Sequence, residues 1–471
     1  MRILLMRGLF YMLGSGRTKI YSNYTEITKD NISDVLLNAY PLFVQNVSEI
    51  NALYSYYKGQ QTILKREKKI RPEHNAKIVS NIAYSIVQFK TGYLLDKPIQ
   101  YVARKDEVVD ENLIALNDFM VLEGKESKDK AIANAKEICG VAYRLALPNK
   151  NYQKGALDES PFNLYTLKPQ QTFVVYSTDI GEKPLLACVV LTTKDLDGNE
   201  IITLQAYSKD TYYEFVYGTQ TLLRVEPHTY GDIPIVEYPN NEERIGSFEL
   251  VLSLLDAINL LESDRVNATT QFVQSLMVFK NIEISQEMLK DLQEMGAINI
   301  SDNGEVEAKI EFLQQELNQE QTQKLKDDLM DMVYKIVGMP LGKSGTIGNS
   351  QGAVIMRDGW SEVEAKALDD ELVFKASERQ LLKLVLNYMR TLTLGESKLN
   401  IADIEIKFTR RNYENLYQKA QVLTMMLAQP KIAPRLAFVV CGLFADPEQA
   451  YAESEQYYNS LGEAQPNATT E

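Results

Sequence analysis

A glycine-rich segment between two long helical patterns constrains the fold of this chain more than any other feature. Residues 338–352 contain five glycines and one proline. Because glycine costs about 1 kcal/mol in a helix interior and proline about 3 kcal/mol, no regular helix continues through this segment. The segment also lacks the G-x-x-x-x-G-K-[ST] spacing of a phosphate-binding loop. We therefore predict a moving loop here, and a simple linker between two helices is the open alternative.

The helical patterns that precede this loop predict a stalk with a tip. Residues 247–279 contain no glycine or proline, and as a helix they span about 50 Å. Their first half is apolar, but residues 262–271 are almost wholly polar, so half of this helix must leave a core. Residues 314–337 carry only a narrow apolar stripe, which predicts a returning helix that is solvated on most sides. Between the two helices we predict a short helix at 286–295 and a hairpin with strands at 297–300 and 306–310.

The rest of the chain completes an α+β fold. Residues 141–238 are rich in β-branched and aromatic residues and predict an antiparallel sheet, with a hairpin turn at Asp197 and Gly198. After the glycine-rich loop, residues 353–394 predict a long helix with a bend at Gly359 and with Trp360 in the core. The other predicted elements are helices at 33–58, 75–90, 110–122, 416–428 and 434–444, a helix stop at Gly92, strands at 98–101 and 404–408, and a loosely ordered acidic tail from Glu453.

Composition argues against several classes of function. The net charge of −14 argues against tight binding of nucleic acid, which needs Lys and Arg to displace counterions, but it permits DNA to slide past. His74 and His228 are the only histidines, so we expect no catalytic residue, no metal site and no cofactor. The three cysteines are far apart and fit reduced, packed thiols of a cytosolic protein: Cys139, Cys188 and Cys441.

The sequence also bears on membranes and on the start of the chain. No apolar run reaches the ~20 residues that span a bilayer, and we expect no membrane contact. A signal peptide is not favoured within residues 1–13, because Arg7 interrupts the apolar run. Met6 and Met12 remain alternative natural starts.

Short motifs along most of the chain, taken in order, resemble those of a known family. Motifs of this kind occur at RPEHN (71–75), TGY (91–93), KPIQY (97–101), IPI (233–235), NNEER (240–244), LD (255–256), ESD (262–264), SQGA (350–353) and FTRRN (408–412). With the stalk layout, they make the chain resemble a tailed-bacteriophage portal protein, of the type found in long-tailed phages of Gram-positive hosts.

The resemblance implies a homo-oligomeric ring, typically of twelve subunits, around a channel for double-stranded DNA. The ring would be assembled in the host cytoplasm and kept in the virion, at one vertex of the capsid. The implied partners are the packaging terminase ATPase, the major capsid and scaffolding proteins, and a head-tail adaptor. The implied parts are the wing (1–246), a first stem helix (247–279), the clip (280–313), a second stem helix (314–337), the tunnel loop (338–352), the long wing helix (353–400), and the crown with the C-terminal tail (401–471).

An acidic ring suits such a channel, because every neutralised phosphate adds affinity and therefore friction. We expect contacts with DNA from two groups of residues, Lys343, Ser344, Thr346, Asn349 and Gln351 in the tunnel loop, and Lys324, Lys326 and Lys335 on the returning helix. The open alternative is that these three lysines pair with Asp327, Asp328 and Asp331 on a solvated face. We expect clip contacts with the packaging motor or the tail adaptor from Asp302, Asn303, Val306 and Ile310.

Two other classes of function are open on the sequence alone. The first is a nuclease or phosphotransfer enzyme that uses Asp369, Asp370 and Glu371 with magnesium. Three consecutive residues of a helix cannot all face one ion, which argues against it. The second is an adaptor built on a helical hairpin that forms no channel, and a failure to form closed rings would favour it.

Overall fold

The computed structural model of the chain describes most of its residues. These are residues 16–69, 72–104, 111–153, 158–195, 197–273, 276–280, 309–313, 319–340, 360–392, 399–410, 416–444 and 447–463. They form two compact units, which we describe separately. The body unit comprises Met1–Tyr54, Ala83–Leu250 and Val337–Glu471, and the hairpin unit comprises Ser55–Ile82 and Val251–Ile336.

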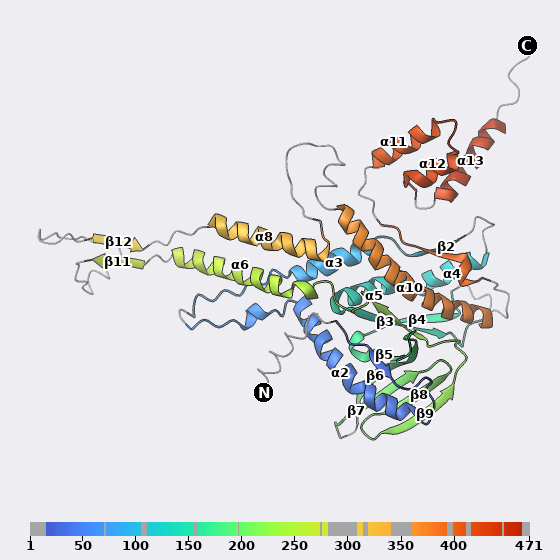
Figure 1. Cartoon of the computed structure of the whole chain (residues 1–471), viewed down its shortest axis with the longest axis horizontal. Coiled ribbons are helices and arrows are strands. Elements are labelled where there is room, and N and C mark those ends of the chain that lie inside the picture. Colours follow the sequence, from blue (N-terminus) through green and yellow to red (C-terminus); the bar gives the residue numbers. More distant parts are fainter. Residues whose placement is uncertain are drawn as a thin grey trace, which may run out of the picture. The chain divides into compact units, whose positions relative to one another are not determined.

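A six-stranded sheet forms one half of the body unit (Figure 1). Its first strand runs parallel to its neighbour, and the other pairs are antiparallel. Helix α2 (Ile32–Tyr57) packs on one face, where Leu36 and Phe43 enter the core with Val175 and Leu186 of the sheet. The strands, in spatial order, are β1 (Ile20–Ser22), β5 (Thr172–Ser177), β6 (Pro184–Lys194), β7 (Glu200–Tyr207), β8 (Thr211–Val216) and β9 (Thr221–Pro227).

A second core of the body unit surrounds a three-stranded sheet, in which β3 lies between β10 and β4. Long helix α10 is the main cover, and its buried side chains include Phe374, Leu381 and Val385. A two-stranded sheet formed by β2 and β13 closes this core. The elements are β3 (Val141–Pro148), β4 (Phe162–Leu167), β10 (Ile235–Pro239), β2 (Gln100–Ala103), β13 (Ile404–Lys407), α3 (Ile82–Leu94), α4 (Glu111–Leu122), α5 (Lys125–Cys139) and α10 (Trp360–Leu392).

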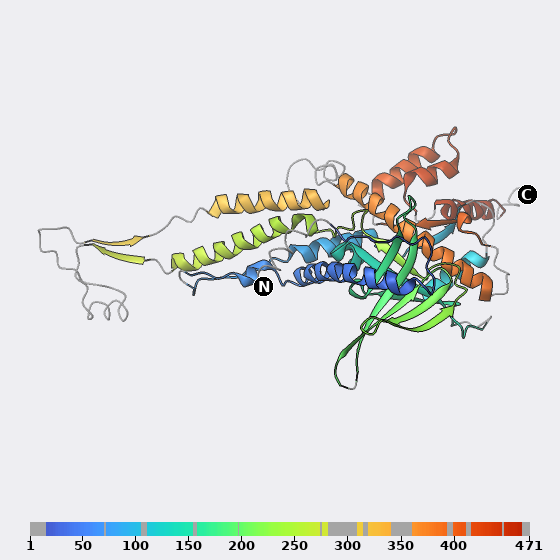
Figure 2. The same cartoon turned by 60° about the horizontal axis from the view of Figure 1, so that its bottom comes forward.

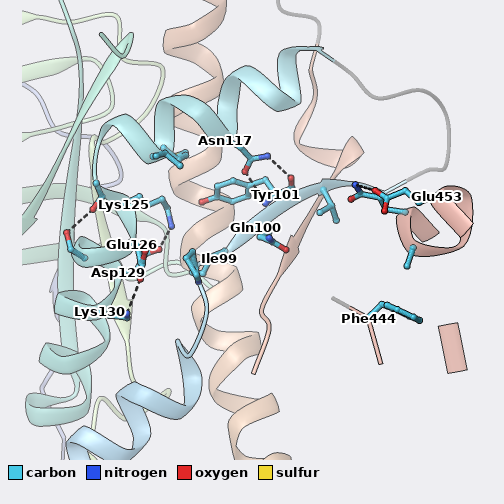
Figure 3. Close-up of a pocket in the computed structure, with 18 residues that line it drawn as sticks. Ile99, Gln100, Tyr101, Asn117, Lys125, Glu126, Asp129, Lys130, Phe444 and Glu453 are labelled. Carbon is cyan, nitrogen blue, oxygen red and sulfur yellow. Dashed lines mark hydrogen bonds and ion pairs between the residues drawn. The ribbon is translucent and has the colours of Figure 1, made fainter. Parts of the chain in front are cut away.

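Four charged side chains are buried inside this second core. Arg144 binds Asp129 at 2.6 Å, and Lys125 binds both Asp129 at 2.6 Å and Glu378 at 3.0 Å. Figure 3 shows Lys125 and Asp129 beside Tyr101. Although burial opposes it, the charges of Lys125 and Arg144 hold the pKa of Glu378 below its usual value. Two hydroxyl groups also donate to Glu378, those of Tyr101 and Tyr238.

Three helices near the C-terminus pack on one another, α11 (Leu416–Leu427), α12 (Pro434–Cys441) and α13 (Pro447–Glu463). Phe438 of α12 stacks on Phe444 and meets Tyr451 of α13 edge to face, with ring centres 5.7 Å apart. The prediction of a loosely ordered tail from Glu453 is wrong for residues 453–463, which are helical, and residues 464–471 lie outside the described residues. The hairpin unit contains α6 (Leu252–Val273), α8 (Gln319–Val337) and strands β11 (Leu276–Lys280) and β12 (Lys309–Leu313).

Much of the predicted secondary structure is confirmed. Helices α2 and α4, strands β5 to β7 with their turn at Gly198, and helices α11 and α12 lie within a few residues of their predicted positions. All three cysteines are free and buried. Trp360 was predicted to lie in the core, but its side chain is only half-buried.

The structure differs from the sequence-based expectations in three other places. Helix α3 begins at Ile82, not at residue 75, and runs through Gly92 to Leu94. The first stalk helix ends at Val273, and residues 276–279, which were predicted as helix, lie in strand β11 (Leu276–Lys280). The described part of the returning helix is Gln319–Val337, and residues 314–318 of its predicted range lie outside the described residues. Finally, α5 was not predicted, because its buried Lys125, Asp129, Lys136 and Glu137 hide the apolar period of the helix.

Candidate functional site

The two long helices of the hairpin unit run side by side in opposite directions (Figures 1 and 2). Arg265 of α6 donates to Gln323 of α8 at 2.8 Å, and Glu262 binds Lys326 at 2.5 Å. The α6 residue of the second pair precedes that of the first, whereas its α8 partner follows that of the first, so the helices are antiparallel. Beyond them, β11 pairs antiparallel with β12, with Val278 opposite Glu311. This confirms an outgoing and a returning helix that are joined through paired strands.

An extended segment, residues 76–80, lies along α6, and we call it the strap. Three backbone N–H groups of the strap donate to side chains of α6 at distances of 2.8–2.9 Å. The bonds join Ala76 to Asn267 Oδ1, Ile78 to Ser263 Oγ, and Ser80 to Asn259 Oδ1. Successive N–H groups of an extended backbone point to opposite sides, so every second N–H of the strap points toward α6. The three acceptors lie four residues apart and share one face of α6.

The acceptors on α6 are buried, although they are polar. Asn259, Ser263 and Asn267 are at most 4% exposed. Asn259 also donates to Gln61 Oε1, and the Gln61 amide donates to Asn81 Oδ1 at 3.0 Å. Buried polar groups of this kind are stable only when hydrogen-bonded. The strap therefore explains why the second half of α6 is polar: part of that polar face binds backbone instead of water.

The segment that precedes the strap is held to α6 by charged and hydroxyl groups. Asp256 accepts hydrogen bonds from Tyr56 at 2.9 Å and from Thr62 at 3.0 Å, and burial raises the pKa of this carboxyl group. Asp264 accepts one from Arg66 at 2.6 Å. Residues 55–82 thus form a layer on α6, as both views of the chain show beside that helix (Figures 1 and 2).

The predicted DNA contacts of the returning helix fall into two groups. Lys326 is half-buried and paired with Glu262 of α6 rather than with an aspartate of its own helix. Lys324 and Lys335 are exposed on α8.

Most of the other predicted contact residues lie outside the described residues. In the tunnel loop and just after it these are Lys343, Ser344, Thr346, Ile347, Asn349, Gln351 and Gly359. In the clip they are Asp302, Asn303, Val306 and the strand predicted at 297–300. Ile310 lies in β12, opposite Phe279.

Gly338, the first residue of the glycine-rich loop, and Trp360, the first described residue after the loop, both have contacts within the body unit. At the first end, Gly338 has a φ of +72° and lies under the side chain of Lys366 of α10. At the start of α10, Trp360 contacts Phe89 and Tyr93 of α3, with ring centres 6.3 Å and 6.0 Å apart. The Tyr93 hydroxyl donates to Glu364 of α10 at 2.6 Å, one turn after Trp360. Both sets of contacts involve α10.

The structure offers little support for a carboxylate metal site. Glu371 binds Arg410 and Lys375, Asp370 lies 3.9 Å from Lys90, and Asp369 is exposed. Within the described ranges, no group of three or more His, Cys, Asp and Glu side chains is placed to hold a metal ion. A cavity of about 1060 Å³ lies beside Lys125 and Asp129 (Figure 3). Both of these charges are paired within the protein, so neither is available to activate a ligand.

The residues that sequence reasoning missed are the strap acceptors on α6. The sequence predicted only that half of this helix leaves a core, because the sequence does not show what covers a polar face. The available signal was the four-residue spacing of Asn259, Ser263 and Asn267, each short enough to bind backbone. Their partners are nearly two hundred residues away in the sequence. No local pattern connects the two segments.

Comparison with known proteins supplies the family. The model of a phage portal protein family, SPP1 Gp6-like, matches residues 43–466. The chain belongs to this family. It is accordingly a phage portal protein, a structural component of the virion. A relative is the portal protein of Bacillus phage SPP1, which is 22% identical over 401 residues, or 81% of this chain and 76% of the relative.

Two solved structures are similar to this portal protein. They are the necks of an empty and of a native GTA particle, computed with C6 and C12 symmetry, with TM-scores of 0.47 and 0.44 and identities of 13% and 11%. Each match covers 78% of this chain and 91% of the other chain. Among the described helices, none combines the length and the apolar composition needed to cross a bilayer.

Proposed function

We propose that twelve copies of this portal protein form a ring around a channel through which double-stranded DNA enters and leaves the capsid. The observation that carries this proposal is the antiparallel pair of α6 and α8, in a chain whose family match spans residues 43–466. A charge of −14 per copy suits such a channel, because a field of one sign keeps DNA from adhering to its wall.

In this proposal the parts have the roles that the resemblance implies. Residues 247–279 and 314–337 are the stem, 280–313 the clip and 338–352 the tunnel loop. The remaining parts are the wing (1–246), the long wing helix (353–400) and the crown with the tail (401–471). We add residues 55–82 to the stem, because the strap and its neighbours are bonded to α6. The stem of each copy then has three layers instead of two.

The tunnel loop supplies the contacts with moving DNA, and Lys343 is the first of them to test. We expect Lys343→Ala to leave ring assembly intact and to change the amount of nuclease-protected genome in phage particles. Lys194→Ala, an exposed lysine of β6, is the control and should change neither property. A Lys343→Ala protein that fails to assemble would show instead that the loop packs subunits. Lys324 and Lys335 are the exposed stem candidates for the same assay.

The clip receives the separate proteins that supply force and continue the tail. These are the packaging terminase ATPase, which docks in the host cytoplasm, and the head-tail adaptor, while capsid and scaffolding proteins surround the ring. We expect the double change Val306→Asp and Ile310→Asp to abolish binding of the ATPase or the adaptor to purified rings. Unchanged binding of both would refute this assignment. The ring itself has no catalytic role, and cleavage of DNA by purified rings with magnesium would contradict that.

A further inference from the structure

The hairpin unit is a flat stack of layers, which we call the plate, and its two outer sides differ in composition. This difference indicates which surfaces of neighbouring copies meet in the ring. We infer that the apolar stripe of α8, defined as Leu325, Met332 and Ile336, packs against the strap side of the hairpin unit in the next copy. The inference rests on the proposed ring and names the surfaces that close it. It is argued from three features of the unit: the order of its layers, the surface of α8, and the charge of the strap side.

Helix α6 lies in the middle of the plate. The strap binds α6 through Asn259, Ser263 and Asn267, whereas α8 binds it through Glu262 and Arg265. At about 100° per residue, Glu262 lies about 100° and Arg265 about 160° around the helix from Ser263. The strap and α8 therefore cover nearly opposite faces of α6. One outer side of the plate belongs to α8, and the other belongs to residues 55–82.

The outer side of α8 carries an uncovered row of apolar side chains. Leu325, Met332 and Ile336 are 50%, 48% and 47% exposed. They are seven and four residues apart, so they follow one stripe along the helix. A single exposed apolar side chain needs no explanation, but a continuous row of them marks an interaction surface. The flank of this helix is acidic, with Asp327 and Asp328 exposed.

The strap side exposes basic side chains. Residues 65–77 contain six Lys and Arg and two Asp and Glu, but Arg66 and Lys68 pair with Asp264 of α6 and therefore add little to the charge of the outer side. Lys69 and Lys77 are exposed there, and Ile78 is 37% exposed beside them. The N–H of Ile78 binds Ser263 of α6, and its exposed side chain is the apolar group that the strap offers at this surface. A basic side with an apolar residue matches the acidic flank and apolar stripe of α8.

A second copy is the occupant that accounts for both sides at once. A plate with complementary outer sides associates head to tail, and such heterologous contacts close into a ring when the rotation fits. DNA phosphate would also be attracted to the basic segment, but it would leave the stripe of α8 exposed. Charge complementarity across the contact would also fix its register along the stem.

A cysteine pair, one on each side of the plate, tests the contact directly. The three native cysteines are buried, so the double variant Ile78→Cys with Met332→Cys has little background. We expect oxidation of assembled rings to give a ladder of covalent multimers, and each single variant to give none. Rings that form but give no ladder overturn the inference and leave the proposed function standing. A protein that forms no rings under any assembly condition overturns both.

Two substitutions provide an independent measurement. Met332→Asp should weaken ring assembly at least tenfold, measured as the subunit concentration at half-assembly. The matched control Leu223→Asp, a 59% exposed residue of β9, should leave assembly unchanged. The charge reversals Asp328→Lys and Lys69→Glu should each weaken assembly, and their combination should restore part of it. If Lys69→Glu weakens binding of a short DNA duplex but leaves assembly unchanged, the basic segment binds DNA phosphate rather than the neighbouring copy, and the inference is wrong.

Discussion

The strap makes a quantitative prediction about amide hydrogen exchange. The N–H groups of Ala76, Ile78 and Ser80 are bonded to α6, whereas those of Lys77 and Val79 donate no hydrogen bond to any described residue. We therefore expect alternating protection along the strap. Ser263→Ala removes the acceptor of Ile78, and an unpaired N–H of this kind costs about 1–3 kcal/mol. Exchange at Ile78 should then become about 5-fold to about 150-fold faster.

The low end of that range is the better expectation, because Ile78 is 37% exposed and water can replace part of the lost bond. Thr270→Ala is the matched control. It removes a hydroxyl from the same helix, but that hydroxyl bonds only Val266 O on the exposed side of α6. Residue-resolved exchange by NMR or mass spectrometry of the purified protein gives the answer. Unchanged exchange at Ile78 in Ser263→Ala, or an equal change in Thr270→Ala, would refute the reasoning.

Three further predictions concern the body unit. Glu378→Gln breaks a buried charge network and should lower the free energy of unfolding, measured by urea denaturation, by about 3–5 kcal/mol. The control Lys130→Ala removes one partner of an exposed ion pair and should lower it by less than about 1 kcal/mol. Burial and the charge of Glu137 raise the pKa of Asp370 above its ordinary value of 3.8. The protonated carboxyl group therefore stabilises the fold fully below pH 3.8, and this stability is lost as pH rises through the raised pKa. Asp370→Asn should raise the melting temperature at neutral pH, and this gain should vanish in acid. Gly140→Ala should destabilise strongly, because its Cβ would lie 1.9 Å from Arg244 O, whereas Gly198→Ala, with φ of +84° and open space, should cost only about 1 kcal/mol.

How far the sequence predicted the fold depended on whether the decisive contacts were local. Strands β6 and β7 with the turn at Gly198 were predictable, because alternation and turn chemistry act within a few residues. Helix α5 was not, because Lys125, Asp129 and Lys136 are buried through partners on other elements. A residue-level pattern treats such groups as solvated.

The candidate site shows the same division. The outgoing and returning helices were predictable from the absence of glycine and proline and from their polar composition. The start of α3 was predicted seven residues too early, because Ile78 and Val79 continue its apolar period although the strap is extended. Its backbone binds Asn259 and Ser263 instead of forming a helical turn. Tertiary hydrogen bonds of this kind override local helix propensity.

The central claim is that the paired helices α6 and α8 of many copies surround one central channel. Electron cryomicroscopy of the purified full-length protein tests it most directly. The account predicts a closed ring in which α6 and α8 of every copy line or surround a central channel, with the strap of one copy against α8 of the next. A compact monomer, an open filament, or a ring whose hairpin units lie away from the central hole would contradict it.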